Sequence, residues 1–402
     1  EKLFLKDLIL KELKLMGGEK IDESKILFSE HHFSHASSAF YPSPFDKAVI
    51  LTLDGVGEWA TTTVAIGEKN SIAIKKVINF PHSLGLLYSA FTYYLGFKVN
   101  SGEYKVMGLA PYGRPIFKDI ILKEIIDLKE DGSFRLNQKY FDYMGGVKMT
   151  NEKFSSLFGY SPRKPETDKL LQFHMDIAAS IQAVIEAVII KITRFLYNKY
   201  KIENLCLAGG VALNCVANGK ILKDKYFKNL WIQPASGDAG GSLGAALAVW
   251  YSELGNKRDN KNEDKMKGAF LGPSFDQKFI NRFLIEKKIP FKKYEEKELI
   301  NFVAIKLSTG NAIGWFQGRM EFGPRSLGSR SILADPRYKD MQKNLNLKVK
   351  FRESFRPFAP AILRESLDQW FEMNCDSPYM LLVAELKKEL KIKMTKKEKD
   401  LF

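Results

Sequence analysis

The sequence is poor in cysteine. Its three cysteines, Cys206, Cys215 and Cys375, have a spacing that fits neither a disulfide framework nor a zinc-binding pair, so we expect a reducing, cytoplasmic setting. No apolar run is long enough to span a bilayer, and residues 1–30 lack the pattern of a signal peptide. We therefore expect no membrane partner.

Acidic residues are too few to balance the basic ones. The 402 residues contain 62 Lys and Arg against 47 Asp and Glu, a formal net charge of +15. Either solvated lysine-rich faces or a phosphate-rich small substrate can account for this excess. A nucleic-acid partner is not expected, because no RNP, zinc-finger or helix-turn-helix signature is visible. The hydrophobic content of 45% is typical of a globular protein and excludes a disordered one.

The order of apolar segments indicates an α/β fold. Three strands are expected between residues 48 and 80, followed by a buried helix over 82–97 and a long helix, or two, over 168–200. The segments NLCLAGG and NLWIQP read as further strands, each followed by a helix. This order suits one half of an actin-like or sugar-kinase-like fold.

Composition divides the chain into two domains. We expect an actin-like domain over residues 1–256, a polar linker over 257–267 and a second α/β domain over 268–402. Residues from about 117 to 165 read as an irregular, polar insertion in the first domain. The lysine-rich stretch over 387–400 reads as a solvated charged helix.

Three of the five histidines are grouped in SEHHFSHASSAF. On a helix, His31 and His35 share one face at a separation suited to two ligands of one metal. His32 points elsewhere, which favours a structural or polar contact. Because histidines four residues apart also arise by chance, a helix that merely carries imidazoles remains the alternative.

Two aspartates could complete a metal site. Asp54 follows an apolar strand, at the end where open α/β sheets place their ligands, although it could simply bond its own turn. Asp238 lies in a glycine-rich turn at a helix start, where it could act as an N-cap and where the helix accepts phosphate. Two histidines with carboxylates suit iron or another first-row divalent ion better than calcium.

Glycine-rich loops and arginines suggest binding of a phosphorylated ligand. In LAGGVALN, Gly209 and Gly210 allow close backbone approach and Asn214 can bond a ribose or base, although tight strand–helix packing would also explain the glycines. Two segments, residues 318–337 and 348–363, place basic side chains among glycine, serine and proline. This pattern indicates an anion pocket, and a basic surface patch or an RNA-binding strip are the alternatives. The basic residues of these two segments include Arg319, Arg325, Arg330, Arg337, Lys350, Arg352 and Arg356.

Together these motifs resemble the nodulation-type and antibiotic-type O-carbamoyltransferases. The resemblance runs in order from about residue 28 to 382. It rests on EHHFSHASSAF, LTLDGVGEWAT, GEYKVMGLAPYG, LAGGVALN, SGDAGGSLGAAL, GRMEFGPRSLGSRSILADPR and FRESFRPFAPAIL.

The resemblance implies an actin-like (ASKHA) domain, similar to the tRNA threonylcarbamoyl transferases, followed by a YrdC-like domain. In that family the second domain makes carbamoyl-adenylate from carbamoyl phosphate and ATP with Mg²⁺. The first domain passes the carbamoyl group to a hydroxyl of a sugar, glycoside or related natural product. Compared with family members, both domains look incomplete, the second one at its C-terminal side.

The resemblance also implies roles for individual residues. A divalent metal, with iron(II) expected first and manganese(II) or zinc(II) as alternatives, would be held by His31, His35, Asp54 and Asp238. Arg325 and Arg356 would act on carbamoyl phosphate and the ATP phosphates, and His32 is a candidate base. The remaining residues expected to bind nucleotide or phosphate are Gly55, Gly57, Lys105, Gly113, Gly209, Gly210, Asn214, Gly240, Gly241, Arg319, Arg330, Lys350 and Arg352.

Two other functions stay open at this point. One is a tRNA threonylcarbamoyl transferase-like enzyme, which the basic charge allows but the fused arginine-rich second domain disfavours. The other is a non-catalytic, nucleotide-binding relative. The identity of the acceptor and the oligomeric state cannot be read from the sequence.

Overall fold

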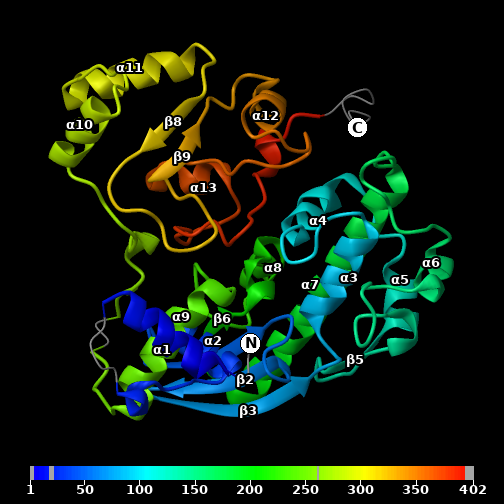
Figure 1. Cartoon of the computed structure of the whole chain (residues 1–402). Helices are drawn as coiled ribbons and strands as arrows, with labels where there is room; N and C mark the ends of the chain where they lie inside the picture. The colour runs from blue at the N-terminus through cyan, green and yellow to red at the C-terminus, as the bar shows by residue number, and fades with distance from the viewer. Residues whose placement is uncertain (1–3, 18–21, 260–261, 394–402) are drawn as a thin grey trace.

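The computed structural model describes residues 4–17, 22–259 and 262–393 (Figure 1). Its described residues up to 259 are called the first region below, and residues 262–393 the second region. In chain order the helices and strands are α1 (Leu5–Leu15), α2 (His31–Phe40), β1 (Lys47–Leu53), β2 (Ala60–Glu68), β3 (Ser71–Asn79), α3 (Leu84–Tyr94), α4 (Glu103–Leu109), α5 (Lys118–Ile120), β4 (Ile126–Leu128), β5 (Phe134–Leu136), α6 (Glu152–Phe158), α7 (Gln172–Tyr200), β6 (Asn204–Ala208), α8 (Cys215–Asp224), β7 (Asn229–Ile232), α9 (Asp238–Ala248), α10 (Gln277–Glu286), α11 (Glu296–Ser308), β8 (Ile313–Phe316), β9 (Arg330–Leu333), α12 (Met341–Asn344) and α13 (Leu367–Trp370).

A five-stranded sheet in the order β3-β2-β1-β6-β7 forms the centre of the first region. β1, β2 and β3 pair antiparallel, with Leu51 opposite Val64, whereas β1, β6 and β7 pair parallel, with Ile50 opposite Cys206. Every residue of β1 after Lys47 is buried, as expected for a central strand covered on both faces. The predicted strands and the α/β class are confirmed.

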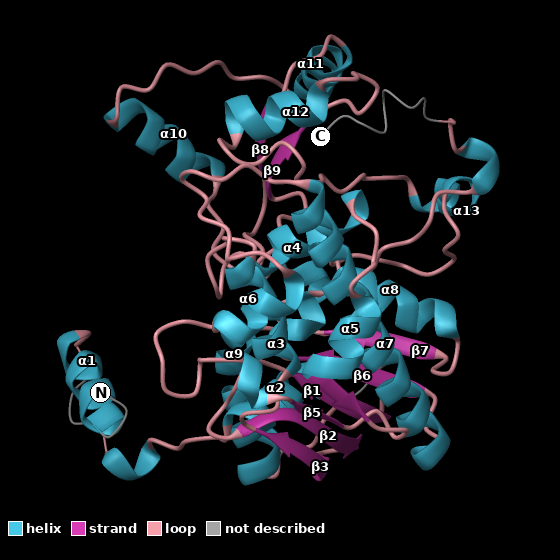
Figure 2. Ribbon diagram, turned by 90° about the vertical axis from the view of Figure 1, so that its right-hand side faces the viewer, coloured by secondary structure: helices cyan, strands magenta, loops and turns pink. Residues whose placement is uncertain are grey.

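Helices cover the two faces of this sheet. Neighbouring residues of β2 point to opposite faces, because side chains alternate along a strand. Thr63 contacts His32 of α2, whereas Thr62 and Val64 line a cavity together with Phe195 of α7. α2 and α7 therefore lie on opposite faces, and α9 packs beside α2 (Figure 2).

The long helix predicted over 168–200 is a single helix, α7, which begins at Gln172. Asp168 lies before it, where its carboxylate accepts hydrogen bonds from the backbone of Lys164 at 2.8 Å and the hydroxyl of Thr167 at 2.9 Å. A carboxylate that bonds its own turn competes with the helical conformation, which explains the later start.

The prediction that residues 117–165 are irregular and polar was wrong. They contain α5, a β4–β5 hairpin and α6, and they bury Ile121, Ile125, Phe134 and Phe154 almost completely in the core. The apolar residues are spread over elements of three to seven residues, too short to produce a periodic pattern in the sequence. Whether this segment is an insertion relative to the family stays a prediction.

The second region is less densely packed than the first. Its regular strands among the described residues are β8 and β9, which form a two-stranded antiparallel sheet. α10 and α11 contain no buried residue. Phe275, just before α10, stacks on Phe279 of α10, which stacks on Phe283, and all three stay 42–45% exposed. The hydrophobic core therefore lies mainly in the first region.

The last lysine-rich stretch is not an α-helix where it is described. It contains a short 3-10 turn at Lys388–Leu390, and the part of the predicted helix from residue 394 onward lies outside the described residues. None of the helices in the described residues combines the length and the apolar character that a bilayer crossing requires.

Arg258, which lies in the segment predicted as a linker, is held against the C-terminal end of α2 and the residues that follow it. Its guanidinium donates hydrogen bonds to four backbone carbonyls, those of Phe40, Tyr41, Ser43 and Phe45, at 2.6–3.0 Å. It also lies 4.5 Å from the centre of the Phe40 ring. Because the carbonyls of Phe40 and Tyr41 stand at the C-terminal end of α2, a cation there also complements the helix dipole.

We expect Arg258→Ala to lower the free energy of unfolding by about 2–4 kcal/mol, because several charge-assisted hydrogen bonds are lost at once. Urea denaturation of the full chain measures this. Arg282→Ala is the matched control, since Arg282 is exposed on α10 and makes one long ion pair at 3.9 Å. An equal, small effect of both substitutions would contradict the clamping role of Arg258.

Candidate metal centre and anion site

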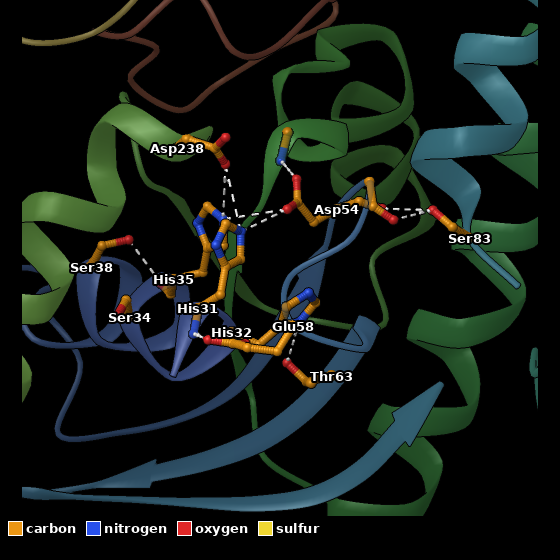
Figure 3. A network of polar contacts seen from close by, with 12 residues as sticks. His31, His32, Ser34, His35, Ser38, Asp54, Glu58, Thr63, Ser83 and Asp238 are labelled. Atoms are coloured by element: carbon orange, nitrogen blue, oxygen red, sulfur yellow. Dashed lines mark hydrogen bonds and ion pairs between the residues drawn. The ribbon is translucent and has the colours of Figure 1, made fainter. Parts of the chain in front are cut away.

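Four side chains from three segments converge at one end of the sheet (Figure 3). His31 and His35 lie on α2, Asp54 directly follows β1, and Asp238 is the first residue of α9. His31 Nε2 lies 3.0 Å from both Asp54 Oδ2 and His35 Nε2, and Asp238 Oδ1 lies 3.6–3.7 Å from the two histidines. One ligand atom from each residue falls within 4.8 Å of all the others. The structure thus brings together the four predicted metal ligands.

The sheet topology places this cluster. β1, β6 and β7 are parallel, so their carboxyl ends share one edge of the sheet. Asp54 follows β1, Gly209 and Gly210 follow β6, and Asp238 begins the helix after β7. Open α/β sheets bind their ligands at such an edge.

Backbone groups hold Asp54 in place. Its Oδ1 accepts a hydrogen bond from the amide of Gly210 at 2.9 Å, which leaves Oδ2 for the histidines. A Cβ atom on Gly209 would lie 2.2 Å from the carbonyl oxygen of Leu53, and Gly209 has φ +85°, so only glycine fits there. These two glycines therefore position the carboxylate.

Two supporting residues were missed by the sequence reading. Glu58 accepts the backbone N–H of His31 with both carboxylate oxygens, at 3.1 and 3.2 Å, at the start of α2. Ser83 donates to the carbonyls of Asp54 and Gly55 at 3.0 and 2.6 Å, and it also caps α3. A signal existed for Glu58, which ends the same glycine turn as Asp54, but none linked Ser83 to the site.

The cluster stabilises positive charge. His35 is fully buried and Asp54 is 7% exposed. Burial opposes a charge on His35, but hydrogen bonds to Asp238 and Asp54 outweigh it and raise its pKa to about 9. Burial likewise disfavours ionisation of Asp54, yet hydrogen bonds from His31 and His35 bring its pKa below the usual range. A buried, ionised carboxylate facing imidazole nitrogens is suited to a cation.

The donor set fits a first-row divalent metal. Two imidazole nitrogens and two carboxylate oxygens are ligands that iron(II), manganese(II) and zinc(II) accept, whereas calcium prefers oxygen donors. The Asp238 side chain is 83% exposed, so one side of the cluster is open to solvent. A ligand could approach from that side.

A buried glutamate organises the arginine-rich loop of the second region. Glu321 Oε1 accepts the backbone N–H groups of Leu327, Ser329 and Arg330 at 2.7–3.2 Å. The loop also lies against the first region, since a Cβ atom on Gly323 would meet the Pro234 carbonyl oxygen at 3.1 Å. Glu321 was not predicted, because nothing in the sequence distinguishes it from a surface glutamate.

The predicted phosphate-binding cations differ in whether they contact their own region or the first region. Arg319 and Arg330 donate to backbone carbonyls of their own region, and Arg330 stacks on Phe316. Lys350 is exposed. Arg325 reaches the first region, where it donates to the Leu213 carbonyl at 3.3 Å.

Arg356 and Lys105 meet at the boundary of the two regions. Lys105 Nζ of α4 lies 2.7 Å from Glu353 Oε1, and Arg356 Nη1 lies 3.5 Å from Glu353 Oε2. The Arg356 guanidinium also stacks 4.2 Å from the centre of the Tyr104 ring. We call Lys105, Arg352, Glu353 and Arg356 the interface cluster.

Comparison with known proteins agrees with these features. A family model described as the carbamoyltransferase N-terminus matches residues 1–247, and one described as the carbamoyltransferase C-terminus matches residues 304–398. The chain belongs to the carbamoyltransferase family. The predicted family resemblance is confirmed.

Several curated members of this family are similar over most of the chain. An uncharacterised protein of Synechocystis is 55% identical over 100% of the chain and 66% of its own length. Nodulation proteins NolNO of Sinorhizobium fredii and NolO of Bradyrhizobium diazoefficiens are each 36% identical, over 95% and 85% of the chain and 54% and 60% of their own lengths. The chain thus spans between about half and two thirds of these relatives.

One solved structure, HypF of T. kodakarensis, aligns with this carbamoyltransferase family member at a TM-score of 0.28. The sequence identity is 15%, over 56% of this chain and 37% of that one. A likeness of this size says nothing about the fold.

In this family member, His32 is turned away from the cluster. Its Nδ1 lies 3.2 Å from the Thr63 hydroxyl of β2, and the whole residue is 3% exposed. Burial lowers the pKa of His32 to about 4, which keeps the imidazole neutral. This placement supports a packing role and gives no support to the predicted role as a base.

Two of the predicted nucleotide-binding glycines are explained by packing. A Cβ atom on Gly113 would lie 2.0 Å from the carbonyl oxygen of Met175, and one on Gly240 would lie 2.0 Å from that of Ala235. Both positions need glycine because backbone passes against backbone.

Three further predicted glycines, Gly55, Gly57 and Gly241, face open space or the histidines. A Cβ atom on Gly55 or Gly241 would meet nothing within 4 Å, so these two positions leave room beside the cluster. A Cβ atom on Gly57 would lie 3.0 Å from the Cβ of His31. Gly57 therefore makes space for the histidine helix.

Asn214 is occupied by protein contacts. Its side-chain amide pairs with that of Gln182 through two hydrogen bonds of 3.0 Å, and its Oδ1 also accepts the Ala217 N–H at the start of α8. Tyr88 in turn donates to Gln182 at 2.9 Å. In this arrangement Asn214 caps α8, and its amide is not directed at a ribose or base.

A glycine on α9 allows the close helix crossing that brings the candidate metal ligands together. A Cβ atom on Gly244 would lie 1.8 Å from the carbonyl oxygen of Ser34 and 3.1 Å from the Cβ of Ser38, so α9 and α2 cross in close contact. This crossing brings Asp238 on α9 to within reach of His31 and His35 on α2.

We expect Gly244→Ala to destabilise the fold by about 1–3 kcal/mol, as overpacking does, and to weaken metal binding by moving Asp238. Gly241→Ala is the matched control on the same helix, because its methyl group meets no atom. That variant should be neutral or up to about 1 kcal/mol more stable, as alanine favours helix. Thermal unfolding and metal titration of both variants measure this, and equal effects would refute the crossing argument.

Proposed function

We propose that this family member is an ATP-dependent O-carbamoyltransferase. Water releases phosphate from carbamoyl phosphate, and the resulting carbamate reacts with ATP to form carbamoyl-adenylate and pyrophosphate. The carbamoyl group is then transferred to a hydroxyl of a sugar, glycoside or related natural product. The observation that carries the proposal is the cluster of His31, His35, Asp54 and Asp238 in a chain that matches both carbamoyltransferase family models.

We place the metal at these four residues, with iron(II) first and manganese(II) or zinc(II) as alternatives. A bound divalent ion would supply Lewis-acid polarisation of the carbamoyl oxygen or orient the adenylate phosphate. The protein's part is to fix the donors. Gly210 and Ser83 hold Asp54, while Glu58 holds the start of the histidine helix.

The cations would bind the phosphorylated substrates. Carbamoyl phosphate and ATP are multiply charged anions, which guanidinium groups bind through paired hydrogen bonds. Lys105 and Arg356 stand together at the boundary of the regions, and Arg325 reaches the start of α8. We assign phosphate binding to these three, and keep Arg319, Arg330, Lys350 and Arg352 as secondary candidates.

The transfer step needs no covalent enzyme intermediate. The acceptor oxygen forms a bond to the carbamoyl carbon while the bond from that carbon to the AMP oxygen breaks. The hydroxyl proton passes to water, and AMP is the leaving group. An open approach to the cluster past Asp238 gives the acceptor a path.

We further propose the division into an actin-like domain over 1–256, a linker over 257–267 and a YrdC-like domain over 268–402. The mixed sheet of the first region, with two antiparallel pairings among β1, β2 and β3 and two parallel pairings among β1, β6 and β7, supports the actin-like half. The described structure has Cys206, Cys215 and Cys375 as free thiols, which supports the proposed cytoplasmic location.

Mass spectrometry tests the proposal directly. The full chain is incubated with ATP and carbamoyl phosphate, and carbamoyl-AMP is the expected product. Metal analysis accompanies it, and a panel of sugars is compared with tRNA as acceptor. Transfer to tRNA alone would favour the threonylcarbamoyl-type reading, and ATP binding without carbamoyl-AMP would favour a non-catalytic relative.

A further inference from the structure

A carboxylate stands at the centre of the interface cluster. Glu353 bridges Lys105 of the first region, at 2.7 Å, and Arg356 of its own region, at 3.5 Å. The Lys105, Glu353 and Arg356 side chains are 24%, 29% and 13% exposed. One carboxylate is thus held between two cations and partly shielded from water.

The positive charge around Glu353 exceeds its own charge. Arg352 is a third cation in the same cluster, and it donates to the neutral Asn346 amide oxygen at 2.6 Å. Burial, and secondly the charge of the nearby Arg356, lower the pKa of Arg352. An anion with more charge than a carboxylate would be held more strongly at this place.

We propose that Glu353 is a built-in competitor of the phosphate ligand. Its carboxylate holds the place of a phosphate between Lys105 and Arg356, and it must swing out before a phosphorylated substrate binds there. The proposal rests on the proposed function, in which these cations bind phosphate. Only the molecules in which Glu353 has swung out can bind an anion between Lys105 and Arg356. Every anion that binds there therefore loses apparent affinity by the same factor.

A latch is the competing explanation. Glu353 could serve only to join the two regions, because Lys105 belongs to α4 and Glu353 to the second region. Removing its charge would then loosen the boundary and weaken anion binding. The two explanations predict opposite changes in affinity.

The test is calorimetric titration of the full chain with inorganic phosphate and with sulfate. Glu353→Gln should bind both anions about tenfold more tightly, with the same factor for each, because the competing charge is gone. Glu298→Gln removes the same charge from the exposed face of α11 and should match the unsubstituted protein. Adding Lys105→Met to Glu353→Gln should abolish the gain.

Glu353→Asp keeps the charge but shortens the side chain, and should give an intermediate gain. Unchanged or weaker anion binding by Glu353→Gln would overturn the proposal, as would an equal gain in Glu298→Gln or binding to no variant. Thermal unfolding of each variant shows that it is folded.

The carbamoyl-AMP assay separates this proposal from the proposed function. Tighter phosphate binding by Glu353→Gln in a protein that makes no carbamoyl-AMP would leave the competitor standing and overturn the function. Carbamoyl-AMP formation together with unchanged phosphate affinity in Glu353→Gln would support the proposed function and overturn the competitor role of Glu353.

Discussion

Replacing His35 with alanine is expected to remove the metal and abolish carbamoyl transfer while carbamoyl-adenylate formation continues. His35 is fully buried, and its Nε2 lies 3.0 Å from His31 Nε2 and 3.6 Å from Asp54 Oδ2. Its removal leaves His31 as the one imidazole of the four-residue cluster. We expect metal affinity to fall by about 100-fold or more, since even an outer partner of a ligand is typically worth 10–100-fold.

Metal analysis after dialysis measures the first effect, and separate assays of carbamoyl-AMP and of the carbamoylated acceptor measure the second. Ser34→Ala is the matched control on the same helix, because its hydroxyl bonds Ser29 and the Glu30 carbonyl rather than the cluster. Unchanged metal content in His35→Ala would refute the proposal that this cluster binds the metal. Loss of carbamoyl-AMP together with transfer would show that the cluster serves the first step as well.

Replacing Arg356 with alanine is expected to give the opposite pattern, in which metal content stays and carbamoyl-adenylate formation is lost. The Arg356 side chain is 13% exposed and stacks on Tyr104, so its guanidinium is held in place rather than free in solvent. Removing one fixed charge-stabilising donor typically costs about 10²–10³ in rate, and we expect a loss of that order.

Arg364→Ala is the control for Arg356→Ala. It removes the same charge from the same region, where the Arg364 side chain is 58% exposed and pairs with Asp376. Arg356→Lys should recover only part of the rate, because an ammonium group cannot reproduce paired guanidinium contacts. A rate for Arg356→Ala equal to that of Arg364→Ala would refute the role of Arg356 in phosphate binding.

The convergence of the four candidate metal ligands could be predicted from sequence because they occupy positions that topology fixes. A residue directly after a parallel strand lies at the carboxyl edge, and this applies to Asp54 after β1. Histidines at helical spacing share a face, which applies to His31 and His35. Local patterns were therefore sufficient once the strand order was right.

Glycines and amides were less predictable, because their roles depend on backbones far away in the chain. Gly113 passes against Met175, and Asn214 pairs with Gln182. Neither partner stands near its counterpart in sequence, so the same residues were read as nucleotide contacts. Glu353 was missed for a related reason, since its partner Lys105 is 248 positions away.

The order of the metal donors along the chain has a consequence for biosynthesis. Asp54 is held by Gly210, which lies 156 positions later, and the last donor, Asp238, follows it. A ribosome therefore releases His31, His35 and Asp54 long before β6 and α9 exist. The β1–β2–β3 meander needs only local pairing, whereas the parallel β1–β6 pair must wait for a distant partner. If these four residues hold a metal as proposed, its loading would be a late event, completed after α9 has been synthesised and has docked on α2.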